Sequence, residues 1–356
     1  MTVAGRRGRA ARTLDLPADM LAFSIECARR GWTDGLPVIP PTEERVATML
    51  RGTTREPLDI VAVLPPRQGE ATVQAIAVNA VMAGCEPRHL EILLAAVEGV
   101  SQPAFNLDGI NATTHPCGVL ILVSGPAARR AGVHGGAGCF GPGFPANVAI
   151  GRAIRLLLLG VGGATPGKGD RATQGTPAKL AFCATEREDA SPWPPFHTTR
   201  GLQPADSAVT VFACEGPHNI QDHGSNTSLG IMQTLAGAMG QAGSNNILSL
   251  GEPILALGPE HAATIAADGI SRGDLQRYLH EHARYPVDRL SPEFVEMVRD
   301  RIQGGGGAEG DPSLLAMADD PESIHIIVAG GPGKHSAWMP TFGGMTRPVT
   351  VPLPAR

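Results

Sequence analysis

The sequence is poor in aromatic residues and has no long hydrophobic run. Phe, Trp and Tyr make up only 4% of the chain although 42% of it is hydrophobic, so the core must consist mainly of Ala, Val, Ile and Leu. The longest apolar run, 153–161, is interrupted by Arg155 and is too short to span a bilayer. No apolar segment of signal-peptide length follows the arginines near the N-terminus. We therefore expect a soluble, cytoplasmic protein that does not bind membranes.

Two further absences narrow the classes of function. The six cysteines form no Cys-x-x-Cys pair, which is typical of reduced cytoplasmic thiols rather than of a disulfide framework. The net charge is −5 and no basic stripe interleaved with aromatic residues is present, so we expect no nucleic-acid partner. The 45 glycines and 31 prolines form no long repeats and therefore indicate many ordered turns rather than disorder.

Short apolar strands alternate with helical patterns along the chain. The predicted strands are 60–64, 118–124, 179–183, 208–214, 253–257 and 324–329. Predicted helices cover 15–30, 71–83, 88–100, a stretch from 146, a stretch that starts at Asn226 or Thr227 and ends at Met239, and 271–282. Thr42 and Ser271 are predicted caps. This alternation predicts a layered α/β fold in two α/β halves, with mostly buried strands and Gly-rich functional loops. We expect a basic tail and helix over 1–30, a first half over 31–185, a crossover loop over 186–206 and a second half over 207–356.

The stretch 134–159 combines a glycine-rich loop with the start of an apolar helix near Ala146. Glycines allow backbone N–H groups to approach a ligand, and a helix start adds unpaired donors and partial positive charge. Gly141, Gly143 and Asn147 are therefore candidate anion-binding residues. Arg152 and Arg155 favour the same interpretation, because cations in the first turns of a helix need a negative partner. The phosphate-loop ending Gly-Lys-Ser/Thr is missing, and a tight structural turn is the alternative.

Three histidine-bearing turns in the second half follow predicted strands or begin helices. They are 215–223, the turn at His261, and 330–335. Because such loops gather at the carboxyl ends of strands, we expect them to converge. His218, Asp222 and His223 would transfer protons, or His218 and His223 would bind a divalent transition metal with Asp222 orienting a ring. Structural histidines are the alternative.

Four further residues are candidates for the same site. Lys334 and His335 would meet an anionic group of the substrate. Cys139 lies between glycines near a helix start, a setting that predicts a lowered thiol pKa. Asn79 lies among apolar residues of a predicted helix, where its amide needs either a core hydrogen bond or a ligand.

Several motifs carry a resemblance to a known family. They are WTDGLPVIPPTEERV, AVNAVMAGC, GPGFPANVAIGRAIRL, SPW and VAGGPGKHS. Through them the chain resembles an uncharacterised bacterial family associated with smaller proteins that carry a UGSC motif, in which selenocysteine or cysteine is the reactive residue. The resemblance covers most of residues 30–340, and Asn79, Cys85, Gly141–Gly143, Asn147, Arg152 and His335 lie in its recurring motifs. No UGSC tetrad occurs here, so the resemblance implies that this chemistry belongs to a small partner protein, or that Cys139 replaces it.

Together these features predict an enzyme of the lyase or hydrolase type that acts on a small anionic metabolite. The turns near positions 140, 220 and 335 would surround a single polar hollow. Two alternatives remain, a thiol-dependent oxidoreductase that uses Cys139 and a non-catalytic subunit of a complex with a smaller UGSC-type partner. We also expect a homo-oligomer.

Overall fold

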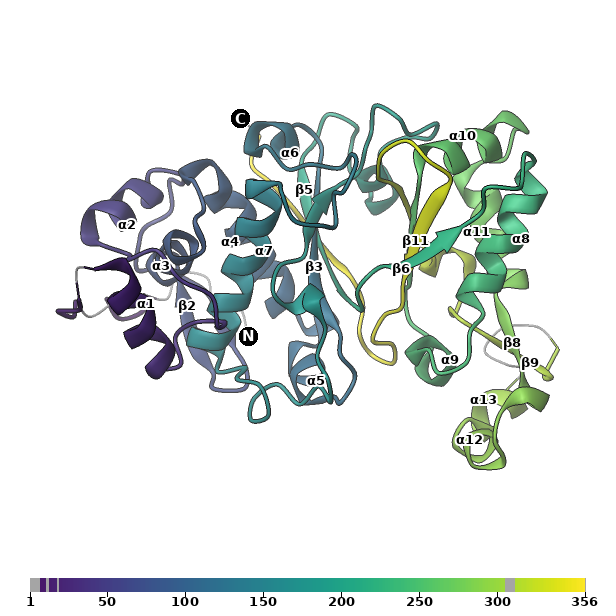
Figure 1. The fold of residues 1–356 in the computed structure, drawn as a ribbon, viewed down its shortest axis with the longest axis horizontal. Coiled ribbons are helices and arrows are strands. Elements are labelled where there is room, and N and C mark those ends of the chain that lie inside the picture. Colours follow the sequence, from purple (N-terminus) through teal and green to yellow (C-terminus); the bar gives the residue numbers. More distant parts are fainter. Residues whose placement is uncertain (1–6, 11–12, 18, 305–310, 356) are drawn as a thin grey trace.

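The computed structural model describes residues 7–10, 13–17, 19–304 and 311–355. Two four-stranded sheets stack face to face, and helices cover the outer face of each sheet (Figure 1). The helices are α1 Met20–Arg29, α2 Glu43–Leu50, α3 Val73–Ala83, α4 Leu90–Ser101, α5 Leu107–Ala112, α6 Pro126–Ala131, α7 Pro145–Leu157, α8 Ser228–Met239, α9 Asn245–Ser249, α10 Pro259–Ala267, α11 Arg272–His282, α12 Pro292–Met297 and α13 Arg299–Gln303. The strands are β1 Ile60–Leu64, β2 Gly69–Thr72, β3 Gly118–Ser124, β4 Cys183–Thr185, β5 Ala208–Cys214, β6 His218–Gln221, β7 Ile254–Leu257, β8 Arg284–Pro286, β9 Leu314–Ala316, β10 His325–Val328, β11 His335–Met339 and β12 Val349–Pro352.

The first sheet has the strand order β12-β5-β3-β4. Its central pair, β3 and β5, is antiparallel, and β4 is parallel to β3. Side chains alternate across the sheet, so Ile121 and Val123 of β3 pack under α3, α4 and α7, while Leu120 and Leu122 face the second sheet. Both faces are therefore buried, which explains why the strand sequences are continuously apolar.

The second sheet has the order β10-β7-β11-β6, with β6 at its edge. Leu255, Ile326 and Trp338 point outward into the core under α8, α10 and α11. Ile254, Ile327 and Met339 point inward and meet the inner face of the first sheet. These layers confirm the predicted layered α/β fold.

Two details of the expected organisation differ. The boundary predicted at residue 207 does not separate the sheets, because β5 and β12 pair within the first sheet. The strand predicted over 179–183 begins only at Cys183, since Pro177–Lys179 form a short 3₁₀ turn after the cap of Thr176.

The predicted helix caps are confirmed. Thr42 and Ser271 both accept backbone N–H hydrogen bonds at their helix starts.

One helical stretch, 145–162, is long and apolar enough to cross a membrane by length and composition. It consists of α7 and the π-turn that follows, and 67% of it is buried beneath the first sheet and neighbouring helices. This is the pattern of the core helix of a soluble protein. The cytoplasmic location stays a prediction.

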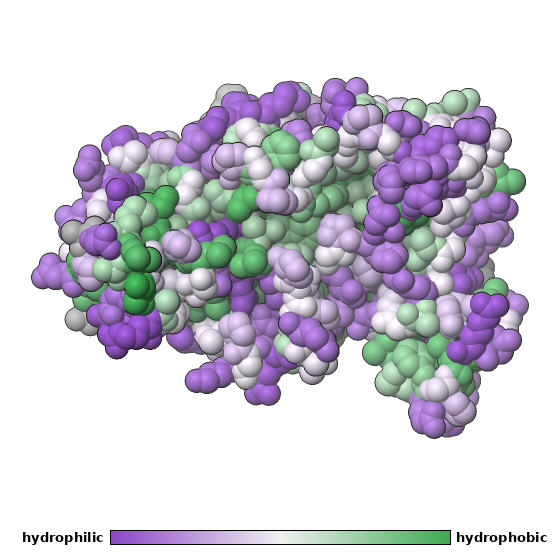
Figure 2. Space-filling view, viewed as in Figure 1, coloured by the Kyte–Doolittle hydropathy of each residue, from purple (hydrophilic) through white to green (hydrophobic). Residues whose placement is uncertain are grey.

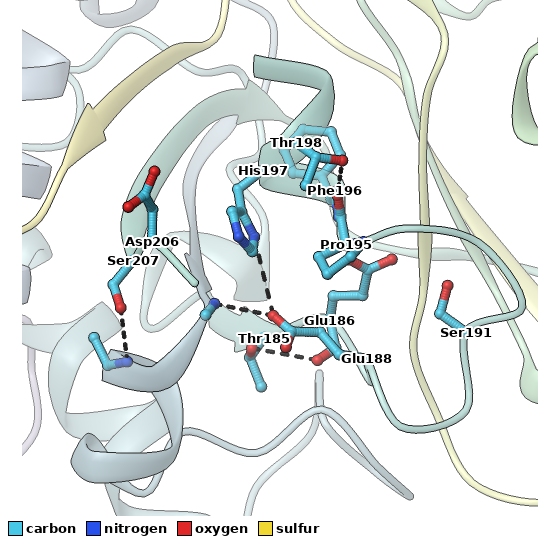
Figure 3. A network of polar contacts seen from close by, with 12 residues as sticks. Thr185, Glu186, Glu188, Ser191, Pro195, Phe196, His197, Thr198, Asp206 and Ser207 are labelled. Atoms are coloured by element: carbon cyan, nitrogen blue, oxygen red, sulfur yellow. Dashed lines mark hydrogen bonds and ion pairs between the residues drawn. The ribbon is translucent and has the colours of Figure 1, made fainter. Parts of the chain in front are cut away.

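The crossover segment 186–206 is fixed to the first half by buried polar contacts (Figure 3). Glu188 accepts a hydrogen bond from the Gly125 N–H, and the Ser207 hydroxyl accepts one from the Ala127 N–H, so both residues satisfy donors at the start of α6. The fully buried His197 lies 4.0 Å from a Glu188 carboxylate oxygen. These contacts are structural and hold the connection between the two halves in place.

Candidate functional site

The three turns expected to converge do come into contact in pairs. The glycine loop meets the segment after β10, where the Gly330 N–H donates to the Gly135 carbonyl at 2.8 Å. Strand β11, which begins at His335, pairs with β6. The side chains do not share one hollow, however, because Cys139 is buried between the sheets while His335 is exposed at the edge.

The candidate histidines His218, His223 and His335 lie on the surface. His261, by contrast, is fully buried, and its ring nitrogens lie 2.8 Å from the Ser336 hydroxyl and 3.2 Å from the Asp222 carbonyl. His335 is 3.0 Å from the Asn219 side chain, and its ring lies edge-on to that of His223 at 4.9 Å between centroids. His218 starts β6 and His223 follows its end, so the strand separates them. Among the described residues, no three His, Cys, Asp or Glu side chains are placed to bind a metal ion. Metal binding by His218 and His223 therefore gains no third ligand of these types from the described residues and stays a prediction.

Asp222 and Lys334 both form hydrogen bonds within the chain. Asp222 is buried and accepts hydrogen bonds from the Ser225 N–H and the Thr234 hydroxyl. Burial opposes ionisation, but these hydrogen bonds prevail and lower the pKa of Asp222 to about 2, so it is a poor proton donor or acceptor near neutral pH. Lys334 Nζ donates to the Ser225 carbonyl and the Asn226 side chain. Both residues brace the turn after β6.

The glycine loop is held from inside by Asn147. Its Nδ2 donates to the carbonyls of His134 and Cys139, and its Oδ1 accepts from the His134 N–H. The amide is thus fully engaged and does not serve as a ligand donor. Gly141 donates to the Gly138 carbonyl, and Gly143 has a φ of 114°, so both glycines shape the turn before α7. Contact of either glycine with a ligand stays a prediction.

Cys139 does not have the predicted lowered pKa. Its side chain is buried, and this burial raises its pKa to about 11, although the N–H groups of Cys139, Phe140 and Gly330 act in the opposite direction. Cys139 does lie near a helix start, as predicted. The rise in pKa caused by burial of the sulfur, however, is larger than the decrease caused by the nearby N–H groups. Asn79 donates to the Ala75 carbonyl within α3, which is the core hydrogen bond of the two expected alternatives.

Arg152 binds the chain itself rather than leaving its charge free. Its guanidinium makes a two-point contact with the Asp34 carboxylate, at 2.7 and 2.8 Å, and donates to the carbonyls of Leu36 and Pro37. The Asp34 side chain is only 2% exposed. Arg152 therefore fixes segment 34–37 against α7, and its expected role as an anion ligand is not supported.

A cavity of about 30 Å³ lies beside α7, between α5, the start of β3 and the loop that precedes β4. Its polar lining consists of Asn111, Arg155, Asp170 and Lys179, and Cys117 also lines it. Lys179 Nζ donates to both Asp170 oxygens at 2.8 and 2.7 Å, while Arg155 Nη1 reaches the same carboxylate at 3.3 Å. Two cations thus share one carboxylate.

The charges in this cavity are largely removed from water. The side chains of Arg155 and Lys179 are 13% and 14% exposed, and that of Asp170 is 6% exposed. Burial lowers the pKa of Arg155, and Asp170 only partly compensates. At Asp170 two cations face one carboxylate, while the neighbouring Arg152 is matched by Asp34 and Glu215 lies against His115. Because a buried charge needs a partner, the surplus positive charge suits an anionic ligand.

A histidine–carboxylate pair lies next to this cavity. His115 Nε2 is 2.7 Å from Glu215 Oε1, and the ring stacks on Phe342. His115 Nδ1 is buried and has no hydrogen-bond partner among the described residues. Cys117, two residues further on, lines the cavity, and a Cβ on Gly216 would lie 3.8 Å from Ala178, another lining residue. The pair has the geometry of an oriented imidazole with one free nitrogen.

The sequence contained some signal for this cavity. Arg155 interrupts an apolar helix, and the long Gly- and Pro-rich stretch after it is of a length that is usually functional. Asp170 and Lys179 lie in this stretch, yet nothing local pairs them with Arg155. His115 and Glu215 are 100 residues apart, so their contact was out of reach of pattern analysis.

Comparisons of the chain with protein-family models, curated proteins and solved structures find no match. The resemblance carried by the sequence motifs therefore stays a prediction, and the site must be interpreted from its own geometry.

Proposed function

We propose that the chain is an enzyme of the lyase or hydrolase type that binds a small anionic metabolite at the cavity of Arg155, Asp170 and Lys179. One observation carries the proposal, namely that two largely buried cations share a single carboxylate. Leaving such a cation without a full counter-charge is costly, and an incoming anion removes that cost.

The cavity favours a carboxylate as the anion. Its volume of about 30 Å³ is the space of roughly two water molecules, since one water needs about 10–15 Å³ on the same measure. A carboxylate presents two oxygens of that size. Arg155 offers a planar donor pair and Lys179 a point charge, so together they would hold the group while the rest of the metabolite extends outward.

The His115–Glu215 pair would carry out proton transfer. Glu215 holds the ring through Nε2, which leaves Nδ1 to accept or donate a proton at a carbon or oxygen next to the bound carboxylate. The cations would also stabilise negative charge that develops there. This assignment keeps the predicted histidine acid–base chemistry but moves it from His218 and His223 to His115.

Binding can be tested by thermal unfolding with a panel of small acids. We expect acetate, malonate, succinate or malate to stabilise the protein, by about 2.7 kcal/mol at a hundredfold excess over Kd, while acetamide has no effect. Lys179→Met should remove the stabilisation, whereas Lys168→Met, an exposed lysine of the same loop, should retain it. An equal response in both variants, or no response to any acid, contradicts the proposal.

Catalysis is tested separately with whichever acid binds. Proton NMR in D₂O should show exchange or conversion of the bound acid, and His115→Gln should bind it normally yet slow the reaction by about 10²-fold or more. An acid that binds but never exchanges or reacts would make the chain a binding protein and remove the enzyme assignment.

A further inference from the structure

Helix α1 is apolar on two faces, although only one of them packs against the residues that the structure describes. Phe23 and Cys27 point inward and are buried. On the outward side, Met20, Leu21 and Ile25 are 52%, 67% and 61% exposed. Leu21 and Ile25 are four residues apart and therefore lie on one face of the helix. A surface helix normally shows polar residues there, so this second face needs a cover.

The apolar surface continues beyond the helix. Ser24 of α1 hydrogen-bonds the backbone of Val38, which places the strand-like segment 36–39 alongside α1. Arg152 in turn joins that segment to α7. We call the resulting surface the α1 patch, and its exposed members are Met20, Leu21, Ile25, Leu36, Ile39 and Val148. Figure 2 shows hydrophobic residues gathered at this end of the molecule.

The size of the α1 patch matches the requirement of a dimer. Six large side chains, on average about half exposed, present roughly 600 Å² of apolar surface, which is at the upper limit for a monomer. Covering it on two copies would bury roughly 1,200 Å², the lower end of the range of specific interfaces. The patch therefore provides the minimum area of a specific homodimer interface.

The charges at the ends of α1 also fit a second copy. Asp15 and Asp19 lie at the N-terminal end of the helix and are exposed. At the other end Arg29 and Arg30 share one carboxylate, that of Glu26, so the end keeps a net positive charge. Two α1 helices related by a two-fold axis and running antiparallel would bring the acidic end of each next to the basic end of the other.

We propose that the α1 patch is the two-fold interface of a homodimer in which the α1 helices of two copies pack antiparallel. No residue of the α1 patch lines the cavity of Arg155 and Lys179, and the inference does not depend on the proposed function. It predicts an isologous contact, in which the same residues of both copies meet.

The test is the mass of the full chain in solution, measured by light scattering after gel filtration at micromolar concentration. The natural sequence should have twice the 36.9 kDa of one chain. The double variant Leu21→Glu with Ile25→Glu should weaken association by about 100-fold or more, because it would bury charges without partners, and should run as a monomer. Leu229→Glu is the matched control, since Leu229 is 52% exposed on α8 in the other half, and it should remain dimeric.

Circular dichroism and thermal unfolding show whether the double variant is folded. A second measurement is independent of its folding: Ile25→Cys should form a covalent dimer under a mild oxidant, and Leu229→Cys should not. A monomeric natural sequence, a folded double variant that stays dimeric, or equal cross-linking of the two cysteine variants would each overturn the inference.

Discussion

Two arginines on α7, one helical turn apart, have opposite relations to the charges around them. Arg152 meets a carboxylate of its own, Asp34, in a two-point contact that also ties down the carbonyls of Leu36 and Pro37. Arg155 shares Asp170 with Lys179 and lines a cavity. The first arrangement is balanced and complete, whereas the second keeps one positive charge in excess.

This difference separates a structural arginine from a candidate ligand-binding one. Both residues are flanked by the same apolar helix and are buried to nearly the same extent, 12% and 13% exposed. Position in the sequence therefore does not distinguish them. The count of opposite charges around each does, because an unbalanced buried cation is stable only with a further partner.

The largest effect is expected from removal of Arg152, the arginine that has a carboxylate of its own. Arg152→Met leaves the Asp34 carboxylate buried without a cation, and we expect a loss of about 3–5 kcal/mol in the free energy of unfolding. Urea unfolding measures it. Small acids should stabilise this variant as they do the natural sequence. Arg277→Met, which removes an exposed pair on α11, should change stability by only about 0.5 kcal/mol.

The unbalanced group should respond differently to the loss of its carboxylate. Asp170→Asn leaves Arg155 and Lys179 facing each other, and we expect a loss of about 2–3 kcal/mol, because both side chains retain some contact with water. Added malonate or succinate should restore more stability to this variant than it adds to the natural sequence. Equal increments in thermal unfolding temperature would show that no anion enters the cavity.

Local patterns predicted much of the fold. Strands 118–124 and 208–214 were predicted with the bounds of β3 and β5, since both are continuous apolar runs. Thr227 was predicted as one of two possible starts of α8, and it is the cap. Strands β6 and β11 were missed because their sequences, HNIQ and HSAWM, lack an apolar run and are strands only through pairing with each other and with β7.

The candidate site was less predictable than the fold for a physical reason. The partner of a buried charge is determined by the fold rather than by the local sequence. Asp34, for example, lies 118 residues from Arg152 in the sequence. The sequence indicated that both arginines of α7 need negative partners, which the structure provides. The sequence could not indicate that Asp34 would pair with Arg152 alone, whereas Asp170 would be shared by Arg155 and Lys179.

A third buried pair, Glu186 with Arg272, is expected to make the free energy of unfolding depend on pH. Burial raises the pKa of Glu186 to about 7, although Arg272 and the N–H groups of Phe196 and Val328 act against the rise. The folded protein then binds more protons than the unfolded chain between pH 4.5 and 7, so stability should fall as pH rises through this window and level off above it. The slope is at most about 1.4 kcal/mol per pH unit. Glu186→Gln should flatten it, whereas Glu188→Gln should not.

The smallest effect is expected at Cys139. Its thiol is buried, and only backbone N–H groups would stabilise the thiolate if it formed. Because burial raises its pKa to about 11, the thiol stays neutral and carries no charge that needs a cation. Iodoacetamide at neutral pH should modify Cys139 about 100-fold more slowly than a free thiol, which mass spectrometry of the digested protein can follow. Cys139→Ser should cost about 1 kcal/mol and leave the response to acids unchanged. Rapid labelling, or loss of the response to acids in the serine variant, would contradict this prediction. Cys139 would then be a reactive thiolate, and the thiol-dependent oxidoreductase would become the favoured function, although no cation of the described residues balances that charge.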